Sequence, residues 1–250
     1  MKKLVAGFIL FFIFSSQALA AYGLTQSGHL VHSSNQLFQR ADNADLSLTD
    51  NWTIEIWVKF NSFTGTTQDI IDKKEESGNF FGYRFYLNSG HNALNYDNDA
   101  VHAEVAWSPS TGTWYHLALT SSGTTAKFYV NGVQQGADQT TSVAIDGTSA
   151  LGVGGNPNAT GSTLDANVSL VRIWNGTVRS AAQISANMCN VLGATTNLVA
   201  EWTLDNTLND NSGKGYTLTN TNSATFQSDV PAVCQTATPT ADFGTLIRFE

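Results

Sequence analysis

Charged residues are scarce in this 250-residue sequence: Asp, Glu, Lys and Arg together make up 13% of it. Basic residues are the rarer kind, with 12 Lys and Arg against 20 Asp and Glu, and the formal net charge is −8. Because contact with phosphates needs clustered Lys and Arg, this balance argues against a nucleic-acid partner. The sequence also holds only 2 Met, 4 Pro and 2 Cys. A shortage of Met, Lys and Glu is atypical of helical bundles.

Apolar and uncharged polar residues take the place of the missing charges. Hydrophobic residues make up 42% of the sequence and aromatic residues 11%, which is enough for a core and excludes a disordered chain. The sequence holds 29 Thr, 22 Ser and 22 Asn, so its surface is built mainly from hydroxyl and amide groups. Abundant Thr, aromatic residues and Gly favour strands and turns over helices.

One long apolar run stands at the start of the sequence. Lys2 and Lys3 precede the apolar stretch from Leu4 to Phe14, and small residues follow up to Ala20. This order is typical of a signal peptide, whereas a membrane span needs about 20 apolar residues. We predict a signal peptide over residues 1–20, cleaved near Ala20. The mature protein is expected to be secreted or held at the cell surface of a bacterium, without a membrane span.

The two cysteines are Cys189 and Cys234. In an oxidising compartment two lone cysteines most simply form one disulfide, and neither has the neighbours of a metal site. We therefore predict a Cys189–Cys234 bridge.

Alternation of apolar and polar residues dominates the rest of the sequence. From Trp52 to Phe60 every second residue is apolar, which is the pattern of a half-buried strand. Asn131 and Gly132 separate two such runs and predict a hairpin turn. Ser180 and Gln183 fit a capping box at the start of one short helix. The pattern predicts an all-β antiparallel sandwich or jelly roll with a single short helix. Further alternating runs occupy residues 82–87, 101–107, 114–120, 126–130, 168–174 and 198–204.

Several of these segments together resemble a known family. They are Leu46–Phe60, Thr113–Thr120, Ala126–Gly132, Leu151–Gly155 and Leu170–Asn175. In this order and spacing they resemble the laminin-G-like, concanavalin-A-like jelly rolls of secreted bacterial proteins, over roughly residues 24–188. The resemblance implies a β-sandwich that recognises carbohydrate or mediates adhesion.

A further piece, Leu198–Leu204 followed by Asp210–Tyr216, is similar to a segment that often opens such domains. Here it follows the helix and is bracketed by the two cysteines. We expect it to close the same sandwich. One domain over residues 21–234 is therefore predicted, with residues 235–250 as a tail or linker.

Catalytic signatures are weak. Glycoside hydrolases need two carboxyl groups that flank the scissile bond, and the nearest candidates are Asp97 and Asp99 with Glu104. The polar stretch around them, residues 92–99, is typical of a loop. The histidines lack zinc-site spacing, and no nucleophile elbow or phosphate-binding loop occurs. We predict a protein that is not an enzyme, with a secreted glycoside hydrolase of the same fold as the alternative.

Calcium is the one cofactor that the sequence suggests. The resemblance implies that the turn containing Asp210 and Ser212 binds calcium in some relatives, with Asp205 and Asn209 close in sequence. Residues 168–170 read Val-Ser-Leu, where relatives often carry acids, and this departure removes charge from the site. An ordinary turn held by the Asp210 side chain is the alternative.

Carbohydrate sites in such folds combine exposed aromatic rings with polar loop residues. The residues predicted to bind a ligand are Trp57, Phe80, Phe81, Tyr96, Asp97 and Asp99. Trp107, Trp114 and Trp202 fit strand patterns and are predicted to lie in the core. The predicted partner is an extracellular glycan or a surface protein. A purely structural spacer remains a further alternative, and the sequence does not indicate an oligomeric state.

Overall fold

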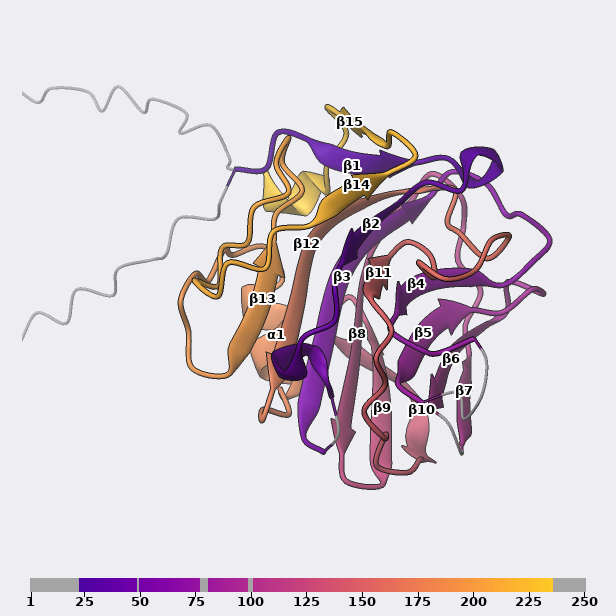
Figure 1. The fold of residues 1–250 in the computed structure, drawn as a ribbon, viewed down its shortest axis with the longest axis vertical. Coiled ribbons are helices and arrows are strands. Elements are labelled where there is room, and N and C mark those ends of the chain that lie inside the picture. Colours follow the sequence, from indigo (N-terminus) through magenta and orange to yellow (C-terminus); the bar gives the residue numbers. More distant parts are fainter. Residues whose placement is uncertain (1–22, 49, 77–80, 99–100, 236–250) are drawn as a thin grey trace, which may run out of the picture.

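In the computed structural model, residues 23–48, 50–76, 81–98 and 101–235 are described, and the predicted signal peptide lies outside them. Two antiparallel sheets pack face to face (Figure 1). The larger sheet has the order β10-β9-β8-β3-β12-β1-β15, with β13 also paired to β12. The smaller sheet has the order β14-β2-β11-β4-β5-β6-β7. The predicted all-β sandwich is confirmed.

The strands range from three residues in β11 to ten in β12. The larger sheet contains β1 (Ser27–Leu30), β3 (Trp52–Phe60), β8 (Trp114–Ser122), β9 (Thr125–Val130), β10 (Val133–Thr140), β12 (Ala166–Asn175), β13 (Leu198–Trp202) and β15 (Thr225–Gln227). The smaller sheet contains β2 (Leu37–Arg40), β4 (Gln68–Asp72), β5 (Tyr83–Leu87), β6 (Ala93–Asn98), β7 (His102–Ala106), β11 (Leu151–Val153) and β14 (Thr219–Thr221). The single α-helix is α1 (Ala181–Asn187), and three 3₁₀ turns are η1 (His32–Ser34), η2 (Ala44–Leu46) and η3 (Ala232–Cys234).

The core lies between the two sheets and follows the alternation in the sequence. On β3, Ile54, Ile56 and Val58 point into this core and are fully buried. Glu55 and Trp57, on the opposite face of β3, are buried as well. The outer face of the larger sheet is therefore covered, and the covering layer is α1 together with the chain that follows it.

A bulge in β12 adapts this outer face to its cover. The register of β12 against β3 shifts between Ser169 and Arg172, and Leu170 has a φ of 42°. Leu170 consequently packs with Trp57 in a small apolar cluster that also contains Val230.

Helix α1 begins with the predicted capping box. Ser180 accepts from the backbone N–H of Gln183, and the Gln183 side chain accepts from the backbone N–H of Ser180. The bridge between Cys189 and Cys234 is present, as the sequence predicted. Residues 198–227 add β13 and β15 to the larger sheet and β14 to the smaller one. Within the described residues, no helix is long and apolar enough to cross a membrane.

Candidate functional site

The outer face of the smaller sheet carries two rows of polar side chains across strands β4 to β7. Cross-strand pairing places Asp72, Arg84, Asp97 and His102 in one row, and Asp69, Tyr86, Asn95 and Glu104 in the other. We call these eight residues the polar face. The residues between them on β5, such as Phe85, point into the core, so the alternation of each strand fixes both faces at once.

Arg84 organises the buried end of the polar face. Its Nε and Nη2 atoms lie 2.7 and 2.6 Å from Asp69 Oδ1, and Nε lies 3.5 Å from Asp72 Oδ2. The guanidinium also stacks over the Tyr86 ring, 4.1 Å from its centroid. Since Arg84 covers this ring, a ligand on the polar face would be recognised by hydrogen bonds more than by stacking.

Exposure increases across the sheet from β4 to β7. The Asp72 side chain is fully buried, whereas those of His102 and Glu104 are about half exposed, at 53% and 52%. His102 Nδ1 lies 2.6 Å from Asp97 Oδ1, and His102 Nε2 lies 3.7 Å from Glu104 Oε2. The β7 side is therefore the part of the polar face that a large ligand can reach.

Burial dominates the electrostatics at the β4 side. It raises the pKa of Asp69 to about 6, although Arg84 acts in the opposite direction. Burial, reinforced by the neighbouring Asp69, raises the pKa of Asp72 well above its ordinary value. Perturbed carboxyl groups of this kind concentrate at functional sites, although structural ion pairs also produce them.

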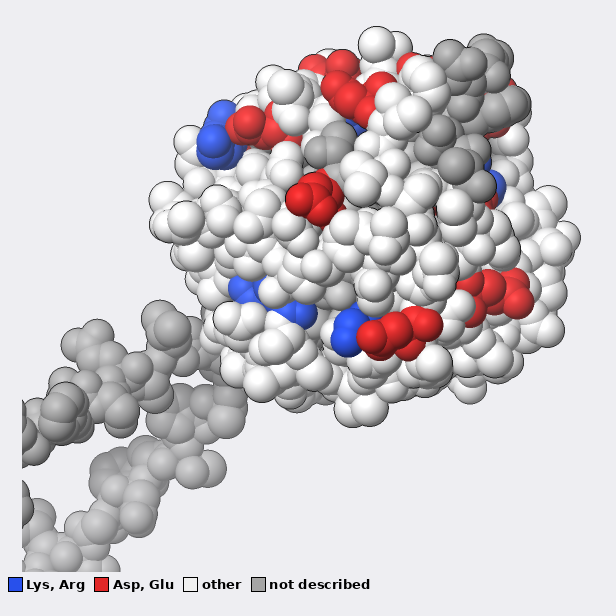
Figure 2. Space-filling model, turned by 90° about the horizontal axis from the view of Figure 1, so that it is seen from below, with Lys and Arg blue, Asp and Glu red and all other residues white. Residues whose placement is uncertain are grey.

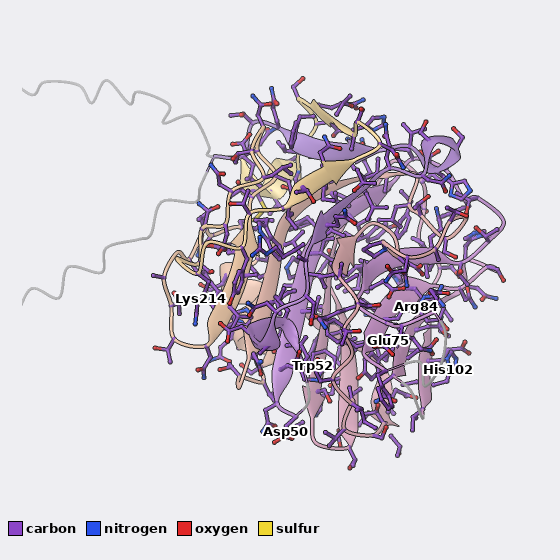
Figure 3. The ribbon with its side chains drawn as sticks, in the orientation of Figure 1. Asp50, Trp52, Glu75, Arg84, His102 and Lys214 are labelled. Atoms are coloured by element: carbon purple, nitrogen blue, oxygen red, sulfur yellow. A yellow bond between two sulfur atoms is a disulfide. The ribbon has the colours of Figure 1, made fainter. Side chains whose placement is uncertain are left out.

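A polar cavity of about 480 Å³ adjoins the polar face. It is lined by Glu75, Glu76, Thr148, Ser149 and Asn158. Glu75 Oε1 accepts from the backbone N–H of Thr148 at 2.9 Å, and Glu76 Oε1 accepts from Asn156 Nδ2 at 2.7 Å. Figure 3 shows Glu75 with Arg84 and His102 on one side of the molecule and Lys214 on the opposite side.

A second concavity, of about 550 Å³, lies beside the disulfide. Trp57, Trp114, Met188 and Val233 contribute to its mainly apolar lining. Both indole N–H groups are already bonded, that of Trp57 to the Met188 carbonyl at 2.6 Å and that of Trp114 to Asp229 at 3.1 Å. This groove therefore offers few directional groups to a polar ligand.

The turn predicted to bind calcium is held by its own hydrogen bonds. Asp210 Oδ1 accepts from the backbone N–H groups of Glu201 and Ser212, and Oδ2 accepts from Ser212 Oγ and the Tyr216 N–H. A carboxylate has about four lone-pair sites, and these four donors fill them. Asp205 is directed elsewhere, since its Oδ1 accepts from Thr25 and Gln26.

These hydrogen bonds are those of an Asx-type turn, and calcium binding at this turn stays a prediction. The cavity beside the turn, about 570 Å³, holds Lys214, whose Nζ lies 3.1 Å from Asp45. Asn209 lies in the same turn, where its backbone N–H donates to Thr207 Oγ1. Across the residues that the structure describes, no group of three or more His, Cys, Asp or Glu side chains is arranged to hold a metal ion.

The residues predicted to bind a ligand do not gather at one place. Trp57 is 3% exposed and Tyr96 is fully buried in the core against Trp52, so neither presents an open ring to a ligand. Phe80 and Asp99 lie outside the described residues. Phe81 is half-buried next to the 480 Å³ cavity, where its carbonyl accepts from the Glu75 N–H.

Asp97 is the one predicted residue that belongs to the polar face, and its surroundings differ from the expectation. The stretch predicted to be a loop, residues 92–99, contains strand β6, paired to β5 and β7. Strand pairing overrides the turn preference of Asn95 and Asp97, which occupy outer positions of the strand, and of Asn98, which is buried on the inner side. Arg84, Tyr86 and His102 were not predicted as site residues, although their alternation with core residues was a usable signal.

A separate cluster of ionisable groups lies beneath α1, closed off from solvent. Glu55 Oε2 lies 3.2 Å from Arg172 Nη1 and 3.5 Å from His116 Nε2, and Glu55 Oε1 lies 3.1 Å from Arg179 Nε. Burial alone would raise the pKa of Glu55, but Arg172, His116 and Arg179 together lower it to about 2. Because these groups are buried, the cluster has a structural role.

The fold and the sequence together define the class of protein. Residues 33–185, more than half of the chain, match the family described as the concanavalin A-like lectin/glucanases superfamily. The chain belongs to this superfamily. No curated protein matches the sequence.

Solved structures share the same fold at low sequence identity. A candidate carbohydrate-binding protein from Bacteroides ovatus is 19% identical with a TM-score of 0.65, and the match covers 83% of this chain and 60% of that one. A heptameric SAP-like pentraxin from Limulus polyphemus is 14% identical with a TM-score of 0.54, over 81% of this chain and 94% of that one. At these identities the likeness shows the fold alone. This chain thus spans 60% of the length of the Bacteroides protein.

Proposed function

We propose that this protein is a secreted or cell-surface, non-catalytic carbohydrate-binding module that binds an extracellular glycan on the polar face. The main support for this proposal is the pair of polar rows across β4 to β7, in which strand pairing fixes the spacing of the hydrogen-bonding side chains. A rigid array of planar polar groups matches the hydroxyl groups of a sugar, and sites on strands hold their geometry better than sites on loops. Membership of a superfamily that contains lectins supports this proposal.

The burial of the carboxyl groups supports binding over hydrolysis. Asp69 and Asp72 both face Arg84, and both are almost fully buried. Hydrolysis of a glycosidic bond needs two carboxyl groups that reach the bond from opposite sides. A sugar on the polar face would meet Asp97 and Glu104 first, and Asp97 is already engaged by His102.

A glycan array with the full chain tests the proposal, and variants locate the site. Glu104→Ala on the polar face is expected to weaken binding by about tenfold, the effect of one hydrogen bond to a charged group. Trp114→Ala in the apolar groove and Lys214→Ala in the 570 Å³ cavity serve as matched controls and should bind as the wild type does. Loss of binding in either control variant would assign the glycan site to the cavity of that residue instead of the polar face. Release of reducing sugar would favour a glycoside hydrolase, and absence of all glycan binding would favour a structural spacer.

Calcium binding stays a prediction for the Asp210 turn. If calcium is held there, EDTA lowers the melting temperature of the wild type, and Asp210→Ala removes that difference. If the turn is held by hydrogen bonds alone, EDTA has no effect and Asp210→Ala destabilises the protein equally with and without it. Differential scanning fluorimetry of both proteins, with calcium added and then chelated, separates these outcomes.

A further inference from the structure

The polar face contains a buried acceptor that has no partner. Asn95 is 1% exposed and lies between Tyr86 and Glu104 in its row. Its Nδ2 donates to the Ala93 carbonyl at 2.9 Å, whereas its Oδ1 has no hydrogen-bond partner among the described residues. Buried polar atoms are nearly always satisfied in native proteins, so an unsatisfied one calls for an explanation such as an absent ligand. Within the described residues, Asn95 Oδ1 therefore lacks a hydrogen-bond donor.

The protein donors nearby are already engaged. Arg84 donates to Asp69 and, at 2.9 Å, to Thr67 Oγ1, while it also faces Asp72. His102 Nδ1 lies 2.6 Å from Asp97 Oδ1 and 3.4 Å from the Tyr86 hydroxyl, so these groups are engaged with one another. A ligand that satisfies this face must therefore bring its own donors.

The charge of the polar face and its cavity is strongly acidic. Six carboxyl groups lie here, and since burial raises the pKa of Asp69 and Asp72, the negative charge comes mainly from Glu75, Glu76, Asp97 and Glu104. Two cations, Lys74 and Arg84, lie among these carboxyl groups. Lys74 lies 3.9 Å from Asp97, and Arg84 lies 2.6 Å from Asp69. Glu104 and Glu76, by contrast, are exposed. A negative rim of this kind attracts cations and disfavours sulfated or uronic sugars.

We propose that the polar face selects glycans that carry free amino groups over neutral and anionic glycans with the same backbone. This inference rests on the proposed carbohydrate recognition and adds the chemical class of the ligand. An ammonium group supplies three donors and one positive charge, so it can donate to the unpaired acceptor and is attracted by the acidic rim. A hydroxyl group supplies one donor and no charge, and an N-acetyl group removes the charge while adding an acceptor.

Matched oligosaccharides provide the test. Oligomers of β-1,4-linked glucosamine, N-acetylglucosamine and glucose are titrated calorimetrically into the full chain, together with an oligomer of a hexuronic acid. The glucosamine oligomer is expected to bind about tenfold more tightly than its N-acetylated and glucose forms. The advantage should shrink as salt is raised from about 0.05 to 0.5 M, because exposed charges are screened.

Two substitutions locate the selectivity. Glu104→Gln keeps the shape of the side chain and removes its charge, so it should reduce the preference for the amino form while neutral glycans still bind. Asp50→Asn, an exposed charge at the lower end of the sandwich (Figure 3), should leave the preference unchanged. Figure 2 shows how few charges interrupt the surface at that end.

Different results would contradict this inference and the proposed function. Equal binding of the amino and neutral forms, or preference for the uronic form, overturns this inference and leaves carbohydrate recognition standing. An amino preference that Glu104→Gln does not change overturns the assignment to the polar face. Spermine that competes as well as the oligosaccharide would show attraction of charge alone and would also overturn it. Absence of binding to every oligosaccharide defeats the proposed function itself.

Discussion

Asp72 is the residue of the polar face whose ionisation is most opposed by its surroundings. Its Oδ1 accepts from the Lys74 N–H at 2.7 Å, but its Oδ2 has no hydrogen-bond partner in the described part of the chain. Burial and the neighbouring Asp69 raise the pKa of Asp72, and burial raises that of Asp69 to about 6. Both carboxyl groups thus bind protons more tightly in the folded than in the unfolded state. The contribution of Asp69 to stability is full below a pH of about 3.8, the unfolded value, and is lost as the pH rises through about 6, and that of Asp72 is lost as the pH rises through its own raised pKa.

Replacing Asp72 by Asn is therefore expected to stabilise the protein at neutral pH. The amide oxygen can keep the bond to the Lys74 N–H, while the unfavourable charge disappears. We expect the free energy of unfolding to rise by about 1–2 kcal/mol at pH 7.5, with a gain that shrinks toward pH 4. Urea denaturation at both pH values measures this, with the exposed Asp50→Asn as a control. A less stable Asp72→Asn protein at pH 7.5 would contradict the argument.

At the scale of elements, α1 depends on the charges beneath it. A helix of seven residues is too short to be stable alone, so its docking must hold it. Arg172 Nη2 donates to the Asn187 carbonyl and Arg179 Nη2 to the Gln183 carbonyl, both at 2.8 Å. Glu55, on β3, fixes both arginines, and these charge-assisted bonds anchor α1 to the larger sheet near both of its ends.

Glu55→Gln tests this anchoring. Arg172, His116 and Arg179 overcome the effect of burial and lower the pKa of Glu55 to about 2, so the stability that it contributes is present above pH 4.5 and is lost as the pH falls toward 2. The substitution leaves buried arginines without their counter-charge and should destabilise the protein by about 3–5 kcal/mol at pH 7. Hydrogen exchange should show faster exchange in α1. The cap variant Ser180→Ala, expected to lose only about 1 kcal/mol, is the control. Equal losses in the two variants would refute the anchoring.

The elements that the sequence predicts well are those with local signals. The alternation of β3, the turn at Asn131 and the capping box at Ser180 each depend on residues within a few positions of one another. Strand β6 was missed because its outer positions carry Asn95 and Asp97, residues typical of turns. Its pairing partners β5 and β7 flank it closely in sequence and were themselves indicated by alternating runs, but the turn-like composition of β6 hid the pairing.

At the scale of the whole molecule, the sequence pattern does not reveal which face of each sheet is covered. A period of two gives every strand two faces, but only the assembled fold shows that α1, the residues just after it and the segment from Val230 to Cys234 cover the outer face of the larger sheet. This cover removes Trp57 from the candidate ligand-binding residues, while the outer face of β7 stays open. The cysteine pair was predictable because only one pairing exists for two cysteines.

The disulfide should hold this cover in place. It joins Cys189, just after α1, to Cys234, near the end of the described chain, with 45 residues of separation. The double variant Cys189→Ser, Cys234→Ser is expected to lose up to about 4 kcal/mol of unfolding free energy, as the entropy of closing such a loop implies. Because Cys234 packs in the same apolar cluster as Trp57, the variant should also show red-shifted tryptophan emission before global unfolding. Wild-type protein treated with a reductant should behave alike, and an unchanged denaturation midpoint in both would show that the cover is held by packing alone.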